Sequence, residues 1–206
     1  MTKGILLFGG TFDPVHNGHL KVARALAAMR GFERVVFVPT SAPPHKPATV
    51  ASPADRLAML KLATAGEGLF TVSEVELARG GPSYTYDTLT AMREQYGQPA
   101  RLYWMIGMDM LPDLHKWYRA AELVETAEFV IVPRSPWNEQ LEAIFSTLGE
   151  HFQPSVIERL REAVVDTPLV DVSSTDIRRR VAAGEDIAAL TPAAVAAYIT
   201  EKGLYR

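Results

Sequence analysis

Two histidines close a glycine-rich turn near the start of the chain, and their spacing suits contact with phosphate. Residues 9–19 read Gly-Gly-Thr-Phe-Asp-Pro-Val-His-Asn-Gly-His. An apolar run precedes this turn and apolar residues at helical spacing follow it, which predicts a strand, a turn and a helix. Backbone N–H groups and the helix dipole converge at such a turn and favour anions. The residues we expect to contact phosphate here are Gly9, Gly10, Thr11, His16 and His19.

Zinc binding and a purely structural role are the two alternatives for this turn. Two histidines could hold zinc, but a zinc site needs three or four ligands. The sequence has no cysteine, and its remaining histidines lie far away along the chain, at His45, His115 and His151. The glycines also do not follow the G-x-G-x-x-G dinucleotide fingerprint. Phosphate binding is therefore favoured, and a turn that only starts a helix stays open.

Four more polar segments follow predicted strands. They are residues 43–46 after a strand at 35–38, residues 83–89 after a strand at 69–77, residues 107–109 after a strand at 102–106, and residues 173–178 after a strand at 169–172. In an open parallel sheet, ligands bind outside the carboxyl ends of the strands. We therefore expect all four segments to join the histidine turn in one site.

Two of these segments carry groups that suit phosphate. The proline-rich loop at 43–47 is stiff, which reduces the cost of ordering its two cationic side chains. The helix start at 173–176 offers hydroxyls and N–H groups, and the arginine that follows can clamp phosphate. Only one of the three arginines at 178–180 can face this helix start. On the residue types alone, the candidates for phosphate contact are His45, Lys46, Ser174, Thr175 and one of the arginines at 178–180.

The other two segments suit a nucleotide with a charged ring. Ser83 is the expected N-cap of a helix over 84–96, whose first N–H groups could hold a carboxylate. Asp109 could accept hydrogen bonds from ribose hydroxyls. Trp117 could stack on a pyridinium ring, which adds a cation–π contribution to the stacking.

Each of these segments could also have a plainer role. Proline-rich loops are common, and a serine-capped helix needs no ligand, so we expect Asp87 and Thr88 to be ordinary parts of it. Trp117 could belong to the core, and the arginines at 178–180 could be solvated charge. On the residue types alone, these alternatives stay open.

Strand-like and helix-like segments alternate along the chain, which predicts an α/β fold. The pattern is that of a Rossmann-like, doubly wound and mainly parallel sheet. The expected strands are 5–8, 35–38, 69–77, 102–106, 129–132 and 169–172. The expected helices are 20–29, 53–65 behind Ser52 as N-cap, 84–96, 118–126, 139–148, 154–163, one after 173–176, and 192–202. We expect residues 1–206 to form a single domain with a helical insertion at 134–164 and helices at its C-terminal end.

Composition excludes several classes of protein. Lys and Arg number 21 against 24 Asp and Glu, so the net charge of −3 argues against nucleic acid as a main partner. Zero cysteines exclude a disulfide scaffold and agree with a reducing compartment. The apolar run near the start is too short for a signal peptide, and none is long enough to span a membrane. We therefore expect a cytoplasmic protein without a membrane partner.

Together these segments resemble the nucleotidyltransferase superfamily, whose signature is the H-x-G-H turn, and most closely the bacterial nicotinate-mononucleotide adenylyltransferases. The usual family forms are G-G-T-F-D-P-x-H-x-G-H, P-P-H-K, S-[FY]-T-x-x-T-L, G-x-D, a W-Y or W-x pair, and [IV]-S-S-T-x-[IL]-R. This sequence carries them at 9–19, 43–46, 83–89, 107–109, 117–118 and 172–178. The resemblance covers about residues 4–204.

The resemblance implies transfer of AMP from ATP to nicotinate mononucleotide, with pyrophosphate released and no covalent enzyme intermediate. The implied catalytic residues are His16, His19, Lys46 and Arg178. ATP would be bound by Gly9, Gly10, Thr11, His16, His19, His45, Lys46, Ser174, Thr175 and Arg178. Nicotinate mononucleotide would be bound by Ser83, Tyr84, Thr85, Gly107, Asp109, Trp117, Tyr118 and Arg134. Mg²⁺ would accompany ATP and keep several waters, so few protein ligands are expected.

One segment departs from the family, and two other functions stay open. The usual R-P-G-Y is Arg134-Ser135-Pro136-Trp137 here, so only the arginine matches. The nearer alternative is an adenylyltransferase for nicotinamide mononucleotide or phosphopantetheine. Phosphopantetheine enzymes usually carry threonine at the His16 position and lack the 83–89 segment. The farther alternative is a nucleotide sensor without catalysis. The oligomeric state is left undetermined by the sequence.

Overall fold

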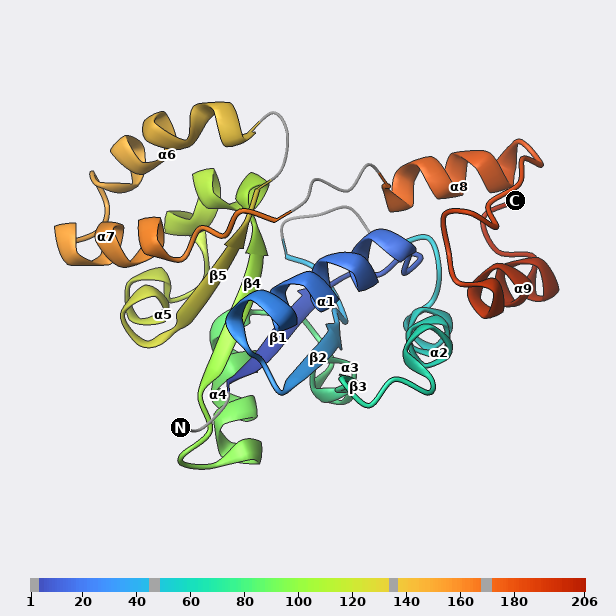
Figure 1. Cartoon of the computed structure of the whole chain (residues 1–206), viewed down its shortest axis with the longest axis horizontal. Helices are drawn as coiled ribbons and strands as arrows, with labels where there is room; N and C mark the ends of the chain where they lie inside the picture. Colours follow the sequence, from blue (N-terminus) through green and yellow to red (C-terminus); the bar gives the residue numbers. More distant parts are fainter. Residues whose placement is uncertain (1–3, 45–48, 134–136, 168–171) are drawn as a thin grey trace.

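The computed structural model describes residues 4–44, 49–133, 137–167 and 172–206. Its centre is a sheet of five parallel strands in the order β3-β2-β1-β4-β5 (Figure 1). The strands are β1 (Ile5–Gly10), β2 (Arg34–Pro39), β3 (Phe70–Val72), β4 (Leu102–Gly107) and β5 (Glu128–Val132). The predicted Rossmann-like, mainly parallel sheet is confirmed.

Helices cover both faces of this sheet. They are α1 (Asn17–Arg30), α2 (Pro53–Thr64), α3 (Val75–Arg79), α4 (Thr85–Tyr96), α5 (Ala120–Thr126), α6 (Leu141–Leu148), α7 (Pro154–Glu162), α8 (Ser174–Ala182) and α9 (Ala193–Lys202), with the 3₁₀ segments η1 (Met108–Lys116) and η2 (Trp137–Gln140). Figure 1 shows α5, α6 and α7 beside β5, while α8, α9 and the C-terminus lie at the other end of the molecule near α2.

Alternating strand residues build two separate cores, which is what a doubly wound sheet requires. In β1, Leu6 and Phe8 pack with α1, α2, α8 and α9, whereas Ile5 and Leu7 pack with α4, η1, α5, α6 and α7. Because both faces are covered, the strands read as continuous apolar runs in the sequence. The single-face alternation typical of an exposed sheet is therefore absent from β1.

The chain changes direction across the sheet at β1. It runs outward from β1 to β2 and β3, and then returns to place β4 and β5 on the other side of β1. Ile5 pairs with Arg34 on one side and with Leu102 on the other. The turn after β1 thus emerges at the topological switch point of the sheet, where open α/β folds bind ligands.

Two predicted elements are wrong in extent. The strand expected at 69–77 is only β3, and Val75 to Arg79 form α3 instead. The alternating pattern misleads there because Glu76 is buried at 3% exposure by contacts with α4, while Leu77 is only half-buried. The helix expected at 118–126 begins at Ala120, because Arg119 has a left-handed backbone with φ 53°.

The predicted N-caps of α2 and α8 and the predicted end of α9 are confirmed. Ser52 caps α2 by accepting from the backbone N–H of Asp55, and Ser173 caps α8 by accepting from Asp176. The helix ending at Lys202 is closed by Gly203, whose φ of 59° suits glycine. The strand expected at 169–172 falls almost entirely outside the described residues and stays a prediction.

Candidate functional site

A cavity of about 560 Å³ opens at the carboxyl ends of β1 and β4. It is lined by every predicted site residue that the structure describes, namely Gly9, Gly10, Thr11, His16, His19, Ser83, Tyr84, Thr85, Gly107, Asp109, Trp117, Tyr118, Ser174, Thr175 and Arg178. His45, Lys46 and Arg134 lie outside the described residues, so their placement stays a prediction. Segments that are distant in sequence thus meet around one volume.

The two histidines of the turn hold each other through a reciprocal helix cap. The backbone N–H of His16 donates to Nδ1 of His19 at 3.2 Å, and the N–H of His19 donates to Nδ1 of His16 at 3.4 Å. Their rings stack with centroids 3.6 Å apart. Because Nδ1 accepts in each ring, the proton of the neutral imidazole is assigned to Nε2, which makes Nε2 a donor. A structural role and a phosphate-binding role for this turn are therefore compatible.

Two glycines leave room for a neighbouring side chain. A Cβ on Gly9 would lie 2.5 Å from the ring of Trp104, which forms the buried floor beneath the turn. A Cβ on Gly107 would lie 2.3 Å from a carboxylate oxygen of Asp109. Both glycines therefore let a neighbouring side chain occupy space at the base of the cavity.

Asp13, which no sequence pattern singled out as a site residue, joins the turn to three other segments. Its carboxylate accepts from the backbone N–H groups of Val50 and Ala51, at 2.7 and 3.1 Å, and from the hydroxyl of Tyr205 at 2.7 Å. Its backbone carbonyl accepts from Arg178 at 2.8 Å. The sequence around Asp13 does not predict these partners, because they lie far away along the chain.

The three consecutive arginines separate as expected from helix geometry. Arg178 lines the cavity and donates to the Asp13 carbonyl and to the Thr175 hydroxyl. Arg179 and Arg180 instead form ion pairs with Asp176 on α8 and with Glu185, which follows the helix. Hydrogen bonds from these two arginines, with that of Arg180 contributing most, hold the pKa of Asp176 below its ordinary value.

The predicted N-cap at Ser83 is wrong. Helix α4 begins at Thr85 and its N-cap is Tyr84, which makes no side-chain capping bond. The Ser83 hydroxyl instead accepts from the backbone N–H of Ser41 at 2.9 Å, and the Ser83 N–H donates to the carbonyl of Ala42. Ser83 is engaged in this way because the loop after β2 lies against it. No side chain of the cap itself satisfies the first N–H groups of α4.

A second buried acid, Glu76, lines the cavity close to this helix start. Its carboxylate accepts from the hydroxyl of Thr88 at 2.7 Å, and Thr88 is itself fully buried. Desolvation raises the pKa of Glu76, and hydrogen bonds with Ser83 and Thr88 offset part of that rise. Thr88 has the structural role that was expected for it. Glu76 was missed because it lies in a stretch that reads as a strand.

Aromatic side chains line the part of the cavity formed by the start of α4 and the end of η1. Trp117 is half-buried, packs against the core beneath η1 and also lines the cavity, so it belongs to the core and reaches the site. The rings of Tyr84 and Tyr118 stack with centroids 4.5 Å apart. Asp109 lines the same cavity as these flat surfaces.

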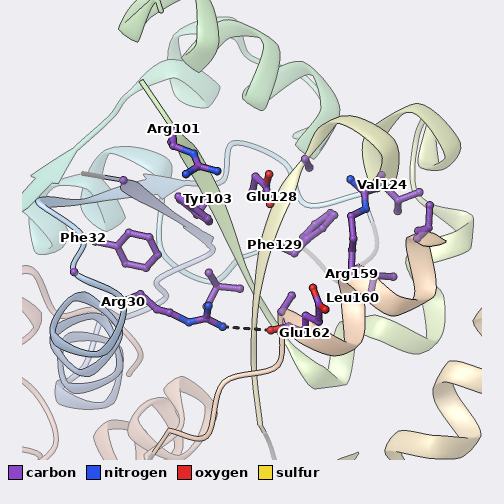
Figure 2. Close-up of a pocket in the computed structure, with 16 residues that line it drawn as sticks. Arg30, Phe32, Arg101, Tyr103, Val124, Glu128, Phe129, Arg159, Leu160 and Glu162 are labelled. Carbon is purple, nitrogen blue, oxygen red and sulfur yellow. Dashed lines mark hydrogen bonds between the residues drawn. The ribbon is translucent and has the colours of Figure 1, made fainter. Parts of the chain in front are cut away.

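A larger cavity of about 720 Å³ lies at the opposite edge of the sheet, where the strands begin. Figure 2 shows Arg30 reaching across it to the backbone carbonyl of Glu162. Arg159 donates to the carbonyl of Val124 at 2.6 Å. These arginines tie helices together, and none of the predicted site residues that the structure describes lies there. The smaller cavity at the switch point is therefore the candidate site.

The described ranges contain neither a metal-binding group nor a membrane-spanning helix. They hold no cluster of three or more His, Asp or Glu side chains that could bind a metal ion. Within the same ranges, no helix combines the length and apolar character needed to cross a bilayer.

Comparison with known proteins gives consistent matches over nearly the whole chain. Residues 7–180 match the model of the family described as cytidylyltransferase-like. A protein of Yersinia pestis described as "Probable nicotinate-nucleotide adenylyltransferase" is 41% identical over 97% of this chain and 94% of its own length. A protein of Neisseria meningitidis with the same description is 42% identical, with 98% of each chain covered. Among solved structures, the Plasmodium falciparum nicotinic acid mononucleotide adenylyltransferase complexed with NaAD shares the fold, with a TM-score of 0.75, 19% identity, and 98% and 97% of the two chains covered.

Proposed function

This chain belongs to the cytidylyltransferase-like family, and we propose that it transfers AMP from ATP to nicotinate mononucleotide. The products are nicotinate adenine dinucleotide and pyrophosphate, which places the reaction in NAD biosynthesis. The observation that carries the proposal is the convergence on one cavity of the histidine turn, the start of α8 and the start of α4. The first two suit phosphates, and the third suits the carboxylate of the acceptor.

We propose direct in-line displacement as the mechanism. An oxygen of the acceptor phosphate forms a bond to the α-phosphorus of ATP, while the bond from that phosphorus to the bridging oxygen breaks. The electron pair of that bond leaves with pyrophosphate. A phosphate monoester is mostly dianionic near neutral pH, so no general base is needed. Catalysis then consists of positioning and stabilisation of charge.

The histidine turn and α8 are the groups to which we assign charge stabilisation. Nε2–H of His16 and of His19 would donate to oxygens of the α-phosphate. Arg178, already held toward the cavity by the Asp13 carbonyl, would neutralise charge that builds up on pyrophosphate. We assign Lys46, with His45, to the same task.

The start of α4 supports nicotinate rather than nicotinamide as the acceptor ring. Helix-start N–H groups are donors only, and the helix dipole adds to their attraction for a carboxylate. A carboxamide would direct its NH₂ group at one of those donors and leave it unpaired, at a cost of roughly 1–3 kcal/mol. We assign Tyr84 and Thr85 to the carboxylate, Asp109 and Gly107 to the ribose side, Trp117 and Tyr118 to the ring, and Arg134 to the acceptor.

A pyrophosphate-release assay across a panel of acceptors tests this function. With ATP present, nicotinate mononucleotide should exceed nicotinamide mononucleotide in kcat/KM by about 10²-fold, and phosphopantetheine should be inactive. Trp117→Ala should weaken both pyridine acceptors and leave their ratio unchanged, because both rings stack alike. Equal efficiency with the two pyridine acceptors would exclude the carboxylate assignment. Binding of ATP without release of pyrophosphate with any acceptor would favour a sensor.

Mg²⁺ enters this proposal as part of the substrate. The Asp13 carboxylate in the cavity wall already accepts three hydrogen bonds, and the described residues offer no cluster of metal ligands. The residues therefore fit an ion held mainly by ATP oxygens and water. We further propose that residues 1–206 act as one domain with 134–164 as a helical insertion. The use of ATP and the lack of cysteine favour the cytoplasm as the place of reaction.

A further inference from the structure

Asp13 holds the histidine turn against two segments that are remote in sequence. It is 4% exposed and lies in the wall of the cavity. One carboxylate oxygen accepts from Val50, and the other accepts from Ala51 and from the hydroxyl of Tyr205. Val50 and Ala51 lead into α2, and Val50 itself lines the cavity. The position of Asp13 therefore fixes the turn and the entry to α2 relative to each other.

Tyr205 is the donor that comes from farthest away. It is the penultimate residue of the chain, it is 8% exposed, and it packs in the core that contains α1, α2 and α9. Burial, with the hydrogen bond to Asp13 as a second cause, raises the pKa of Tyr205 well above its ordinary value. Its hydroxyl therefore stays a hydrogen-bond donor to Asp13 near neutral pH.

Two arginines restrain the backbone segments around the contact between Asp13 and Tyr205. Arg56 is fully buried and donates to the carbonyls of Thr11 and Thr40, at 2.7 and 2.8 Å. Arg178 donates to the Asp13 carbonyl at 2.8 Å. A shift of Asp13 therefore moves the carbonyl that orients Arg178, the group that we assign to the phosphates. We assign the effect of such a shift to the phosphates, because the histidine turn and Arg178 line the cavity and are the groups assigned to ATP.

We propose that Tyr205 is a positioning residue for ATP, because its hydroxyl orients Asp13 and, through Asp13, the histidine turn, the entry to α2 and Arg178. This inference rests on the proposed function only in assigning that part of the cavity to ATP. It predicts that Tyr205, which does not line the cavity, influences ATP without contacting it, and that the acceptor is unaffected.

Tyr205→Phe tests the proposal, with Tyr198→Phe as a matched control. Tyr198 on α9 also donates to an aspartate, Asp55 at 2.9 Å, but neither residue lines the cavity. We expect Tyr205→Phe to lower kcat/KM for ATP and to weaken ATP binding in calorimetry by about tenfold, a size reached by small misplacements of reacting groups. The KM for the acceptor should stay within about twofold, and Tyr198→Phe should change neither substrate.

Coupling to Asp13 separates positioning from a general loss of stability. In an Asp13→Ala background, Tyr205→Phe should have little further effect on ATP affinity, because the acceptor of the Tyr205 hydroxyl is already absent. The proposal is overturned if Tyr205→Phe and Tyr198→Phe weaken ATP binding equally. It is also overturned if the KM for the acceptor rises as much as ATP affinity falls, or if the effects of the changes at Asp13 and Tyr205 on ATP affinity are additive. ATP calorimetry needs no acceptor, so a wild-type enzyme inactive with nicotinate mononucleotide would contradict the proposed function and still permit this test.

Discussion

At the scale of single residues, the histidine turn combines a structural and a chemical task in the same side chains. Each Nδ1 accepts a backbone N–H at the start of α1, so the ring is oriented before any substrate binds. The remaining ring nitrogen is then a donor of fixed direction, which is the form of preorganisation that stabilises developing charge. Because one side chain serves both tasks, a simple alanine change cannot distinguish them.

His19→Ala and His19→Glu together separate these tasks. His19→Ala should lower kcat by about 10²-fold or more, through loss of a donor to the transition state. Glutamate at this helix position can accept the N-cap N–H as in a capping box, but it offers no donor. His19→Glu should therefore recover the melting temperature lost in His19→Ala without recovering kcat. A loss of kcat of about threefold or less in a folded His19→Ala variant would remove His19 from the chemistry.

Glu76 gives a prediction about stability and pH. Burial raises its pKa above the ordinary value of 4.5, so the folded state holds this proton more tightly than the unfolded state does. The contribution of Glu76 to stability is therefore greatest at low pH and is lost as pH rises from 4.5 through the folded pKa. Glu76→Gln does not titrate and should become more stable relative to wild type as pH increases from about 5 to about 8.

Urea unfolding of both proteins at about pH 5 and about pH 8 checks this effect. Glu94→Gln is the control, because Glu94 is exposed on α4, and it should follow the wild-type dependence on pH. Parallel curves for wild type and Glu76→Gln would show that the environment of Glu76 does not favour its neutral form.

At the scale of elements, α8 directs its three consecutive arginine side chains to different surroundings. Consecutive positions on a helix point about 100° apart, so one arginine faces the cavity and the next two face Asp176 and Glu185. The N-cap Ser173 fixes where the helix begins and therefore which arginine faces inward.

The three alanine variants of these arginines should differ accordingly. Arg178→Ala should lower kcat/KM for ATP by about 10²-fold, since it removes a forked donor to the phosphates. Arg179→Ala and Arg180→Ala lose exposed ion pairs and should stay within about threefold. Measurement of KM for ATP and of kcat for all three variants tests the assignment of Arg178. An equal loss in all variants, or the largest loss at Arg179, would contradict the assignment of Arg178.

At the scale of the whole molecule, the two edges of the sheet have different tasks. The carboxyl edge gathers the residues of the site, whereas at the amino edge Arg30 and Arg159 donate to backbone carbonyls of neighbouring segments. Changes at the amino edge should therefore alter stability while leaving catalysis intact.

Arg159→Met provides a test of this division. Loss of the bond to the Val124 carbonyl should reduce the free energy of unfolding by about 1–2 kcal/mol, with kcat/KM unchanged. Arg161→Met is the control on the same helix, because Arg161 pairs with the exposed Glu142 and its loss should have a smaller effect on stability. Urea unfolding and the pyrophosphate assay give both readouts. A loss of activity in Arg159→Met comparable to that in Arg178→Ala would contradict the separation of catalysis at the carboxyl edge from stability at the amino edge.

Strong local signals in the sequence were sufficient for much of the fold and the site. The apolar run of β1, the serine caps at Ser52 and Ser173 and the glycine after α9 each act within one turn or strand. Their positions could therefore be read directly. The order of strands and polar loops also predicted that the site segments meet at one edge, because parallel strands carry their carboxyl ends to the same side.

Tertiary contacts decided what these local signals could not. Glu76 is buried in a helix by its contact with Thr88, so the strand pattern around it was misleading. Ser83 is engaged by Ser41, so it does not cap α4. Asp13 binds Tyr205 across 192 positions of sequence. In each case the packing of segments that are distant in sequence determines the partner of the side chain. The residues next to it in the sequence therefore carry no pattern that predicts this partner.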